Sequence, residues 1–336
     1  MLFFNIKQIF NFNRKFNFPP NYTIMANLHN LFLEFKDELK ITKTKKDSLM
    51  VSKDNLRKKI RDYFKKHHPN YIPRFYIQGS YKLKLLIRTK DDTCDLDDGV
   101  YFEDNPDNVS ASTLQKWVKS AVEDTTDSAV EHRNKCVTVD YKSGYNIDLP
   151  VLLFNSKSDT HPQLAVKNTG FQEDDPKEFV DKFNSVKSDQ MRRLIRYLKS
   201  WCDHKRQDMP SGLAMTVLTM NSYVANTRDD IALKYLLIEI ENVLTKKFSC
   251  VMPTTPKDDL FRNYSETKKK NFMDNLAKFI EDAKKAIDEK NKKKASLLWK
   301  THLGKRFPEG ADEDEVILSS AGLVSTIGTS KPYYKP

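Results

Sequence analysis

The spacing of apolar and polar positions changes character about halfway along the chain. Apolar residues that recur every three or four positions predict amphipathic helices over residues 28–39 and 52–68, the second with Ser52 as its N-cap. A further helix is expected at residues 112–123. Short runs of strand character are expected near residues 74–78, 95–103, 135–141 and 145–153. The first half therefore combines strands with helices.

The second half has helical spacing almost throughout. A polar stretch, residues 155–175, is expected to be a loop, and Pro176 starts a long helix because proline suits the first helical turn. Further helices are expected at residues 211–225, 229–246, 263–290 and 292–303. Strands followed by helices predict an α+β fold, in which a C-terminal α-helical lobe packs on the first lobe and the substrate binds between them.

Three aspartates occupy alternating positions in two of the predicted strands. Asp95 and Asp97 are two residues apart, so both carboxylates point to one face of the sheet, whereas Asp98 points away and is interpreted as structural. Asp148, between two apolar residues of a later strand, can bring a third carboxylate to the same point. Oxygen ligands of this kind suit Mg²⁺ or Mn²⁺, and two such ions assist an in-line displacement at phosphorus. The three aspartates are therefore candidate catalytic and metal-binding residues.

A glycine–serine pair precedes these strands. Gly79 lets the backbone approach a phosphate closely, and Ser80 adds a hydroxyl at the start of a helix expected over residues 81–87. By itself the pair also fits an ordinary strand-to-helix turn. Together with the three aspartates that follow, it indicates a site for phosphoryl transfer.

Three short segments contain these residues: FYIQGSY at 75–81, DLDDGVYF at 95–102 and YNIDLP at 145–150. Together they resemble the cGAS/DncV-like nucleotidyltransferases of bacteria, and the second is especially similar to the DncV-type cyclic GMP-AMP synthases. The similarity extends from about residue 26 to about residue 330. It implies a polymerase-β-like nucleotidyltransferase core and an enzyme that makes a cyclic dinucleotide messenger in anti-phage defence, with ATP and GTP giving cyclic GMP-AMP.

The resemblance assigns roles to residues in both predicted lobes. The metal ligands it implies are Asp95, Asp97 and Asp148, and the nucleotide-binding residues are Gln78, Gly79, Ser80, Tyr81, Lys199, Ser211 and Asp259. Two of these have an alternative interpretation. Lys199 fits a solvated lysine of a helix at residues 191–204, and Ser211 fits an N-cap of the next helix, where a phosphate could also bind.

The composition is typical of a soluble enzyme. The 336 residues are 39% hydrophobic, enough for a sizeable core, and no run approaches the roughly 20 apolar residues of a membrane span. The four cysteines are far apart and include no Cys-x-x-Cys pair, which favours reduced thiols in the cytoplasm over a zinc site. The net charge of +11 suits anionic nucleotides and also permits a long nucleic acid as partner.

Four parts of the chain are expected. Residues 1–24 are a leader, 25–175 the nucleotidyltransferase lobe, 176–305 the α-helical lobe and 306–336 a C-terminal tail. The expected partners are ATP and GTP, an effector activated by the cyclic product, and regulatory proteins of the same operon. Neither a membrane nor nucleic acid as substrate is expected.

Two other functions are alternatives to this one. A linear-product nucleotidyltransferase, either an RNA-tailing polymerase or an oligoadenylate synthase, is the alternative enzyme, which the basic charge slightly favours. A binding protein on a decayed nucleotidyltransferase fold is disfavoured, because all three carboxylates are present.

Overall fold

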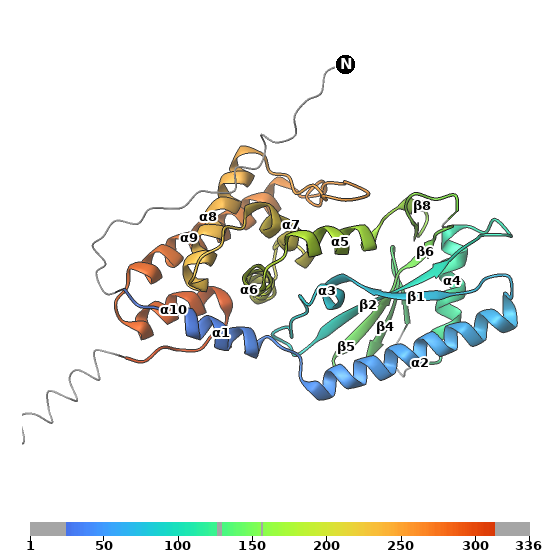
Figure 1. Cartoon of the computed structure of the whole chain (residues 1–336), viewed down its shortest axis with the longest axis horizontal. Helices are drawn as coiled ribbons and strands as arrows, with labels where there is room; N and C mark the ends of the chain where they lie inside the picture. Colours follow the sequence, from blue (N-terminus) through green and yellow to red (C-terminus); the bar gives the residue numbers. More distant parts are fainter. Residues whose placement is uncertain (1–24, 126–129, 156, 313–336) are drawn as a thin grey trace, which may run out of the picture.

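The computed structural model describes residues 25–125, 130–155 and 157–312. One half is a sheet with covering helices, and the other half is a group of packed helices (Figure 1). The predicted leader at residues 1–24 lies outside the described residues, as does the part of the predicted tail after residue 312.

A mixed sheet forms the first half. Its strands are β1 (Arg74–Gln78), β2 (Cys94–Phe102), β3 (Val130–His132), β4 (Val137–Tyr141), β5 (Tyr145–Leu149), β6 (Val151–Leu153), β7 (Gln163–Val166) and β8 (Gly170–Glu173). They lie in the order β3-β4-β5-β2-β6-β7-β8, and β1 also pairs with β2. Strand β2 is therefore central, antiparallel to β1 and parallel to both β5 and β6.

Two predictions for this half are wrong. Residues 145–153 form two strands, because Pro150 between them has no N–H to continue the ladder. The Pro150 carbonyl still accepts a hydrogen bond from the Val100 amide at 2.8 Å, so β2 runs on past the break. Residues 155–175 contain the β7–β8 hairpin, whose four-residue strands are too short to show a clear alternation.

Helices α2 (Lys43–His67) and α4 (Ala111–Val122) pack on the sheet in one buried apolar cluster. Leu56, Ile60 and Phe64 of α2 recur at helical spacing and are fully buried. They share the cluster with Leu96 of β2 and Val139 of β4. Each such side chain contributes about 1.5–3 kcal/mol to folding relative to an exposed position. This core holds the sheet that carries the predicted site.

The start of α2 differs from the prediction. The helix begins at Lys43, and the Thr42 side chain caps it by accepting from the Lys45 amide. Ser52 lies in the middle of the helix, with its hydroxyl 2.9 Å from the Tyr145 hydroxyl, so its prediction as N-cap is wrong. The lysines of the first turn concealed the true start, because basic residues are unfavourable beside the positive end of the helix dipole.

The second half consists of α1 and six later helices. Their bounds are α1 (His29–Glu38), α5 (Pro176–Val186), α6 (Asp189–Lys205), α7 (Gly212–Ser222), α8 (Asp229–Lys246), α9 (Glu266–Asp288) and α10 (Lys292–Leu303). The predicted long helix from Pro176 is two helices. It breaks at Lys187, whose backbone is extended, and the Ser188 side chain then caps α6 by accepting from the Met191 amide at 3.0 Å.

Helix α1 packs with this second half, although it comes first in the chain (Figure 1). The ring centroids of Phe32 and Phe35 lie 5.3 and 5.7 Å from that of Tyr197 on α6. Phe307, after α10, is fully buried against the same two phenylalanines. The predicted tail at residues 306–336 therefore begins with a segment that packs on the helices.

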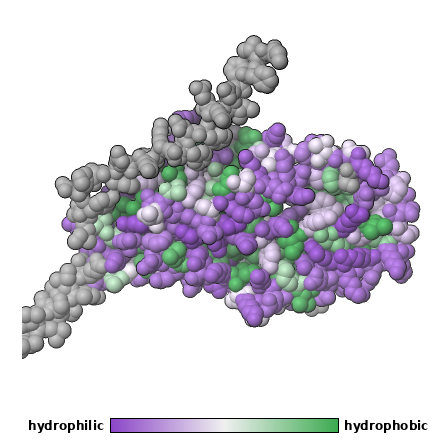
Figure 2. Space-filling model, in the orientation of Figure 1, coloured by the Kyte–Doolittle hydropathy of each residue, from purple (hydrophilic) through white to green (hydrophobic). Residues whose placement is uncertain are grey.

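The outer surface is mostly polar. Figure 2 shows hydrophilic residues over most of one face, with hydrophobic residues scattered among them. None of the helices within the described residues is long and apolar enough to cross a membrane.

Candidate active site

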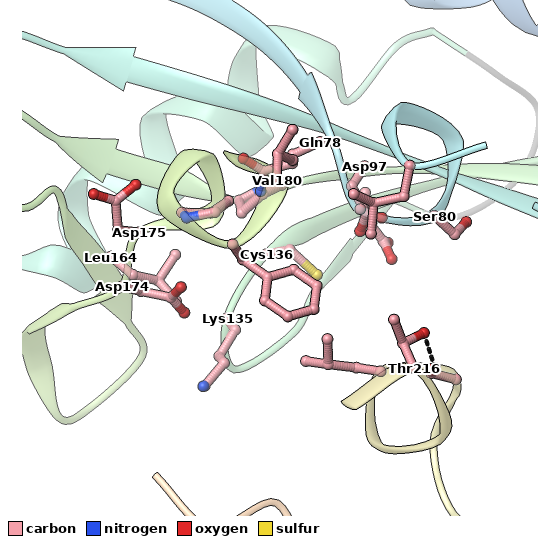
Figure 3. A pocket seen from close by; sticks show the side chains of 18 of the residues that line it. Gln78, Ser80, Asp97, Lys135, Cys136, Leu164, Asp174, Asp175, Val180 and Thr216 are labelled. Carbon is pink, nitrogen blue, oxygen red and sulfur yellow. Dashed lines mark hydrogen bonds between the residues drawn. The ribbon is translucent and has the colours of Figure 1, made fainter. Parts of the chain in front are cut away.

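A cavity of about 530 Å³ lies where the sheet meets the helices (Figure 3). From the sheet it is lined by Gln78, Gly79 and Ser80, by the three predicted aspartates, and by Lys135 and Cys136. From the helices it is lined by residues of α5, α6 and α7, including Phe179, Lys199 and Gly212. Sequence segments more than 100 residues apart therefore meet at one site.

The strand register brings the predicted carboxylates together. Asp97 on β2 is paired with Asp148 on β5, and on its other side with Gln78 on β1. Asp95 precedes Asp97 by two residues on the same strand and lines the same cavity. The alternation predicted from the sequence is confirmed. Leu96, between the two aspartates, and Asp98, after them, are fully buried on the opposite face.

The three carboxylates repel one another in a poorly solvated place. Burial, with added repulsion from Asp95 and Asp148, raises the pKa of Asp97 to about 7. Burial also raises the pKa of Asp148, against the opposing effects of a hydrogen bond from Thr138 and the positive charge of Arg133. Lys199 acts to lower the pKa of Asp97. The site thus has an excess of negative charge that a bound cation would offset.

The glycine–serine turn lies against Asp97. Gly79 has φ of +59°, and a Cβ built on it would be 1.8 Å from Asp97 Oδ2, so only glycine fits here. The Ser80 hydroxyl is buried and has no hydrogen-bond partner in the described residues. A buried polar group without a partner is costly, and an anion or its bound water in the cavity would satisfy it.

The helix predicted over residues 81–87 is wrong, because the observed helix after this turn is much shorter. Helix α3 spans only Gly79–Lys82. The chain then leaves helical geometry because Lys84 has a positive φ of 61°. A single turn still orients the Ser80 amide and hydroxyl at the cavity wall, but it lacks the dipole of a full helix.

Lys199 reaches the cavity from α6. Its Nζ donates to the Leu85 carbonyl at 3.2 Å, and burial lowers the pKa of this lysine, with Asp95 and Asp97 acting to raise it. Gly212 at the start of α7 makes room for it, since a Cβ there would be 2.8 Å from Lys199 Cε. The solvated interpretation of Lys199 is therefore wrong.

Three of the predicted nucleotide-binding residues do not line the cavity. Ser211 caps α7 by accepting from the Ala214 amide at 3.2 Å, while its neighbour Gly212 lines the cavity. The Tyr81 hydroxyl contacts Met50 Sδ at 3.6 Å. The Asp259 carboxylate accepts from the backbone amides of Cys250 and Phe261, at 2.8 and 2.9 Å. The first is a helix cap, the second packs on α2, and the third holds a loop together.

Several residues of the cavity had no signal in the sequence. Lys135 and Cys136 precede β4, and Asp174 and Asp175 precede α5. Burial raises the pKa of Asp174 to about 6, with Lys135 acting to lower it. Lys135 and Asp174 both line the cavity and are labelled in Figure 3. Only the register of the sheet brings them to the site.

The donor set fits divalent cations. Asp95, Asp97 and Asp148 offer carboxylate oxygens, the ligands that Mg²⁺ prefers, and their mutual repulsion gives a reason to bind one. A tighter group, His161, Asp175 and Glu178, has one ligand atom from each residue within 4.8 Å of the others. Its members already bond within the protein, because His161 contacts both Asp175 and Thr255, and Glu178 accepts from the Thr255 amide. That group ties the start of β7 to the loop before α9.

Comparison with known proteins points the same way as the geometry. The family model for the cyclic GMP-AMP synthase DncV-like nucleotidyltransferase domain matches residues 73–152. A cyclic GMP-AMP synthase of Escherichia albertii is 29% identical over 186 residues, which are 50% of this chain and 41% of that protein. The aligned segment thus spans less than half the length of this relative.

Solved structures share the fold over most of the chain. The crystal structure of Vibrio cholerae DncV, a cyclic AMP-GMP synthase, matches with a TM-score of 0.73 at 18% identity, covering 84% of this chain and 98% of that one. The same protein in complex with the linear intermediate pppA(3′,5′)pG matches with a TM-score of 0.73 at 18% identity, covering 85% and 98%. The predicted α+β fold and the predicted resemblance to DncV-like nucleotidyltransferases are confirmed.

Proposed function

Because residues 73–152 match the family model of DncV-like nucleotidyltransferase domains, we propose that the chain joins nucleoside triphosphates into a cyclic dinucleotide. One observation carries this proposal: three carboxylates, an unpartnered serine hydroxyl and a lysine line one cavity between the sheet and the helices. Phosphoryl transfer needs such an arrangement, since catalysis depends on positioning and charge rather than on covalent chemistry by the protein.

Each residue then has a defined task. Ser80 and the backbone at Gly79 hold the donor triphosphate, and Lys199 contacts its phosphates. Asp95, Asp97 and Asp148 would hold two Mg²⁺ or Mn²⁺ ions, and such ions would stabilise the negative charge that develops during phosphoryl transfer. Asp148 also accepts the proton of the attacking hydroxyl.

The reaction balances as two successive displacements. In the first, the 3′-hydroxyl of one nucleotide attacks the α-phosphorus of the other, a P–O bond forms, and the α–β anhydride bond breaks to release pyrophosphate. In the second, the free 3′-hydroxyl of the linear product attacks its own remaining α-phosphorus and releases a second pyrophosphate. The cavity volume of about 530 Å³ is within the usual range for a ligand pocket.

The proposed product is cyclic GMP-AMP, made from ATP and GTP in the cytoplasm. Two considerations support it: the similarity to the Escherichia albertii synthase, and the solved Vibrio cholerae DncV complexes with GTP and with ATP and GTP together. An effector that binds the cyclic product, regulatory proteins of the same operon and a role in anti-phage defence complete the proposal.

The test is direct synthesis in vitro. Purified protein is incubated with the four labelled nucleoside triphosphates and Mg²⁺ or Mn²⁺, treated with phosphatase and analysed by chromatography. A phosphatase-resistant product that requires both ATP and GTP is the expected result. Products that phosphatase degrades, or a ladder of RNA length, would instead establish the linear-product alternative. The variant Asp95→Asn/Asp97→Asn serves as the inactive control.

A further inference from the structure

Thr138 on β4 lies directly opposite Asp148 on β5. Opposed residues of an antiparallel pair project from the same face, so the Thr138 side chain shares the cavity face with the carboxylate. Its neighbours Val137 and Val139 point to the other face and are fully buried in the apolar cluster beneath the sheet. Thr138, between these two valines, is itself fully buried.

The Thr138 hydroxyl bonds to one of the two carboxylate oxygens of Asp148. Its Oγ1 donates to Asp148 Oδ1 at 2.5 Å, the short distance typical of a hydroxyl bonded to a carboxylate. Threonine is branched at Cβ and has few χ1 states, so its hydroxyl is held in place by the strand itself. The Cys136 thiol lies 3.6 Å from the Thr138 oxygen and also donates to Asp148, but a thiol is a weaker donor than a hydroxyl.

We infer that Thr138 is a positioning residue, which fixes Asp148 Oδ1 by a buried hydrogen bond and so orients this carboxylate toward the divalent cation and the attacking hydroxyl. The inference rests on the proposed function, because it gives Asp148 the role described there. Partners that orient a metal-binding carboxylate typically change metal affinity or activity about 10–100-fold when they are removed. An effect of that size is expected here.

A simpler account is that the bond only satisfies a buried hydroxyl. Two variants separate the two accounts. Thr138→Val keeps the shape of the side chain and removes the donor, whereas Thr138→Ser keeps the donor and removes a methyl group. If Thr138 only packs, Thr138→Ser should be affected at least as much as Thr138→Val. If Thr138 positions Asp148, Thr138→Val should be impaired and Thr138→Ser should behave like the wild type.

The experiment measures Mn²⁺ binding as well as activity. Mn²⁺ is titrated into each variant by electron paramagnetic resonance in the presence of a non-hydrolysable ATP analogue, and the melting temperature is recorded without metal. We expect Thr138→Val to weaken Mn²⁺ binding and to raise the half-saturating Mg²⁺ concentration about 10–100-fold. Thr138→Ser is expected to restore both, and kcat is expected to change more than KM for the nucleotides.

The outcomes separate this inference from the proposed function. Unchanged Mn²⁺ binding in Thr138→Val, or equal losses in Val and Ser, would overturn the positioning role. Asp148→Asn is measured in parallel. If it keeps full activity, the proposed role of Asp148 is wrong; if it is inactive while Thr138→Val behaves as wild type, only the inference about Thr138 fails.

Discussion

The two faces of strand β2 carry neighbouring aspartates in opposite surroundings. On the face toward α2, Asp98 is fully buried and accepts two hydrogen bonds from the Arg57 guanidinium, at 2.7 and 2.5 Å. On the cavity face, burial together with Asp95 and Asp148 raises the pKa of Asp97 to about 7, and no arginine pairs with it among the described residues. One face neutralises its charge within the protein, and the other gathers charge that a bound cation would neutralise.

The helical half repeats the first arrangement. Asp229 at the start of α8 is fully buried and accepts from the Arg193 guanidinium on α6, at 2.6 and 2.8 Å, and from the Tyr197 hydroxyl at 3.1 Å. Its carboxylate therefore joins α6 to α8. In this protein the buried aspartates that accept two hydrogen bonds from one arginine are structural, and the cluster of aspartates that lacks such a pair forms the candidate site.

The largest effect is expected on the cavity face. Asp95→Asn/Asp97→Asn should abolish nucleotide turnover, because the amides remove the negative charge needed to bind the metal ions and, through them, the triphosphate. The fold should persist, since the substitutions relieve repulsion instead of breaking a pair. Labelled-nucleotide synthesis and circular dichroism check the two parts. Normal turnover in this variant would refute the assignment of the metal site.

Asp98→Asn, on the other face, should lower stability and leave activity intact. It leaves the half-buried Arg57 charge without its carboxylate, and breaking a buried pair in this way costs about 3–5 kcal/mol of stability. Urea unfolding gives the free energy directly, and activity at low temperature should survive in the folded fraction. A variant as stable as wild type would show that the ion pair is dispensable.

Gly79→Ala tests how closely the turn fits Asp97. The new Cβ would collide with Asp97 Oδ2, and the left-handed backbone costs an alanine about 1–2 kcal/mol. We expect activity to fall about 100-fold through misplacement of the carboxylate and the phosphate-binding turn. Steady-state kinetics measure the loss. Gly170→Ala is the matched control, because that glycine also has positive φ but no atom lies within 4 Å of its Cβ position.

The smallest effect is on the pH dependence of stability without metal. Since the pKa of Asp97 is about 7 in the folded state and near 4 when unfolded, the folded state keeps this proton to a higher pH. The free energy of unfolding should therefore fall as pH rises from about 4 to about 7. Asp97→Asn should flatten that decline, a difference of a few degrees in melting temperature between pH 5 and pH 8 in chelator. Parallel curves for the two proteins would contradict the raised pKa.

The sequence predicted what depends on local alternation. The shared face of Asp95 and Asp97, the opposite face of Asp98, and the return of Asp148 on a later strand all follow from a period of two residues. What depends on pairing between distant segments could not be predicted. Lys135 and Asp174 reach the cavity only through the register of β4 and the β7–β8 hairpin.

Errors in helix bounds have local causes. The cap at Thr42 could not be recognised because the first turn of the helix is basic. The helix after Ser80 is short because Lys84 has a left-handed backbone, for which the sequence has no signature.

The nucleotide-binding role of Asp259 rests on similarity alone. In the structure its carboxylate accepts hydrogen bonds from two backbone amides.

Lys199 couples the helical half to the sheet half electrostatically. The lysine belongs to α6 and the helical core, whereas Asp95 and Asp97 belong to the sheet and its separate core. The attraction between Lys199 and Asp97 varies inversely with the distance between them, so the charge state of Asp97 depends on how closely the two cores are seated. Separation of the halves would weaken this attraction and would also let water reach Asp97, and these two changes act on its pKa in opposite directions. The protonation of a single aspartate thus depends on how two separate apolar cores are seated against each other.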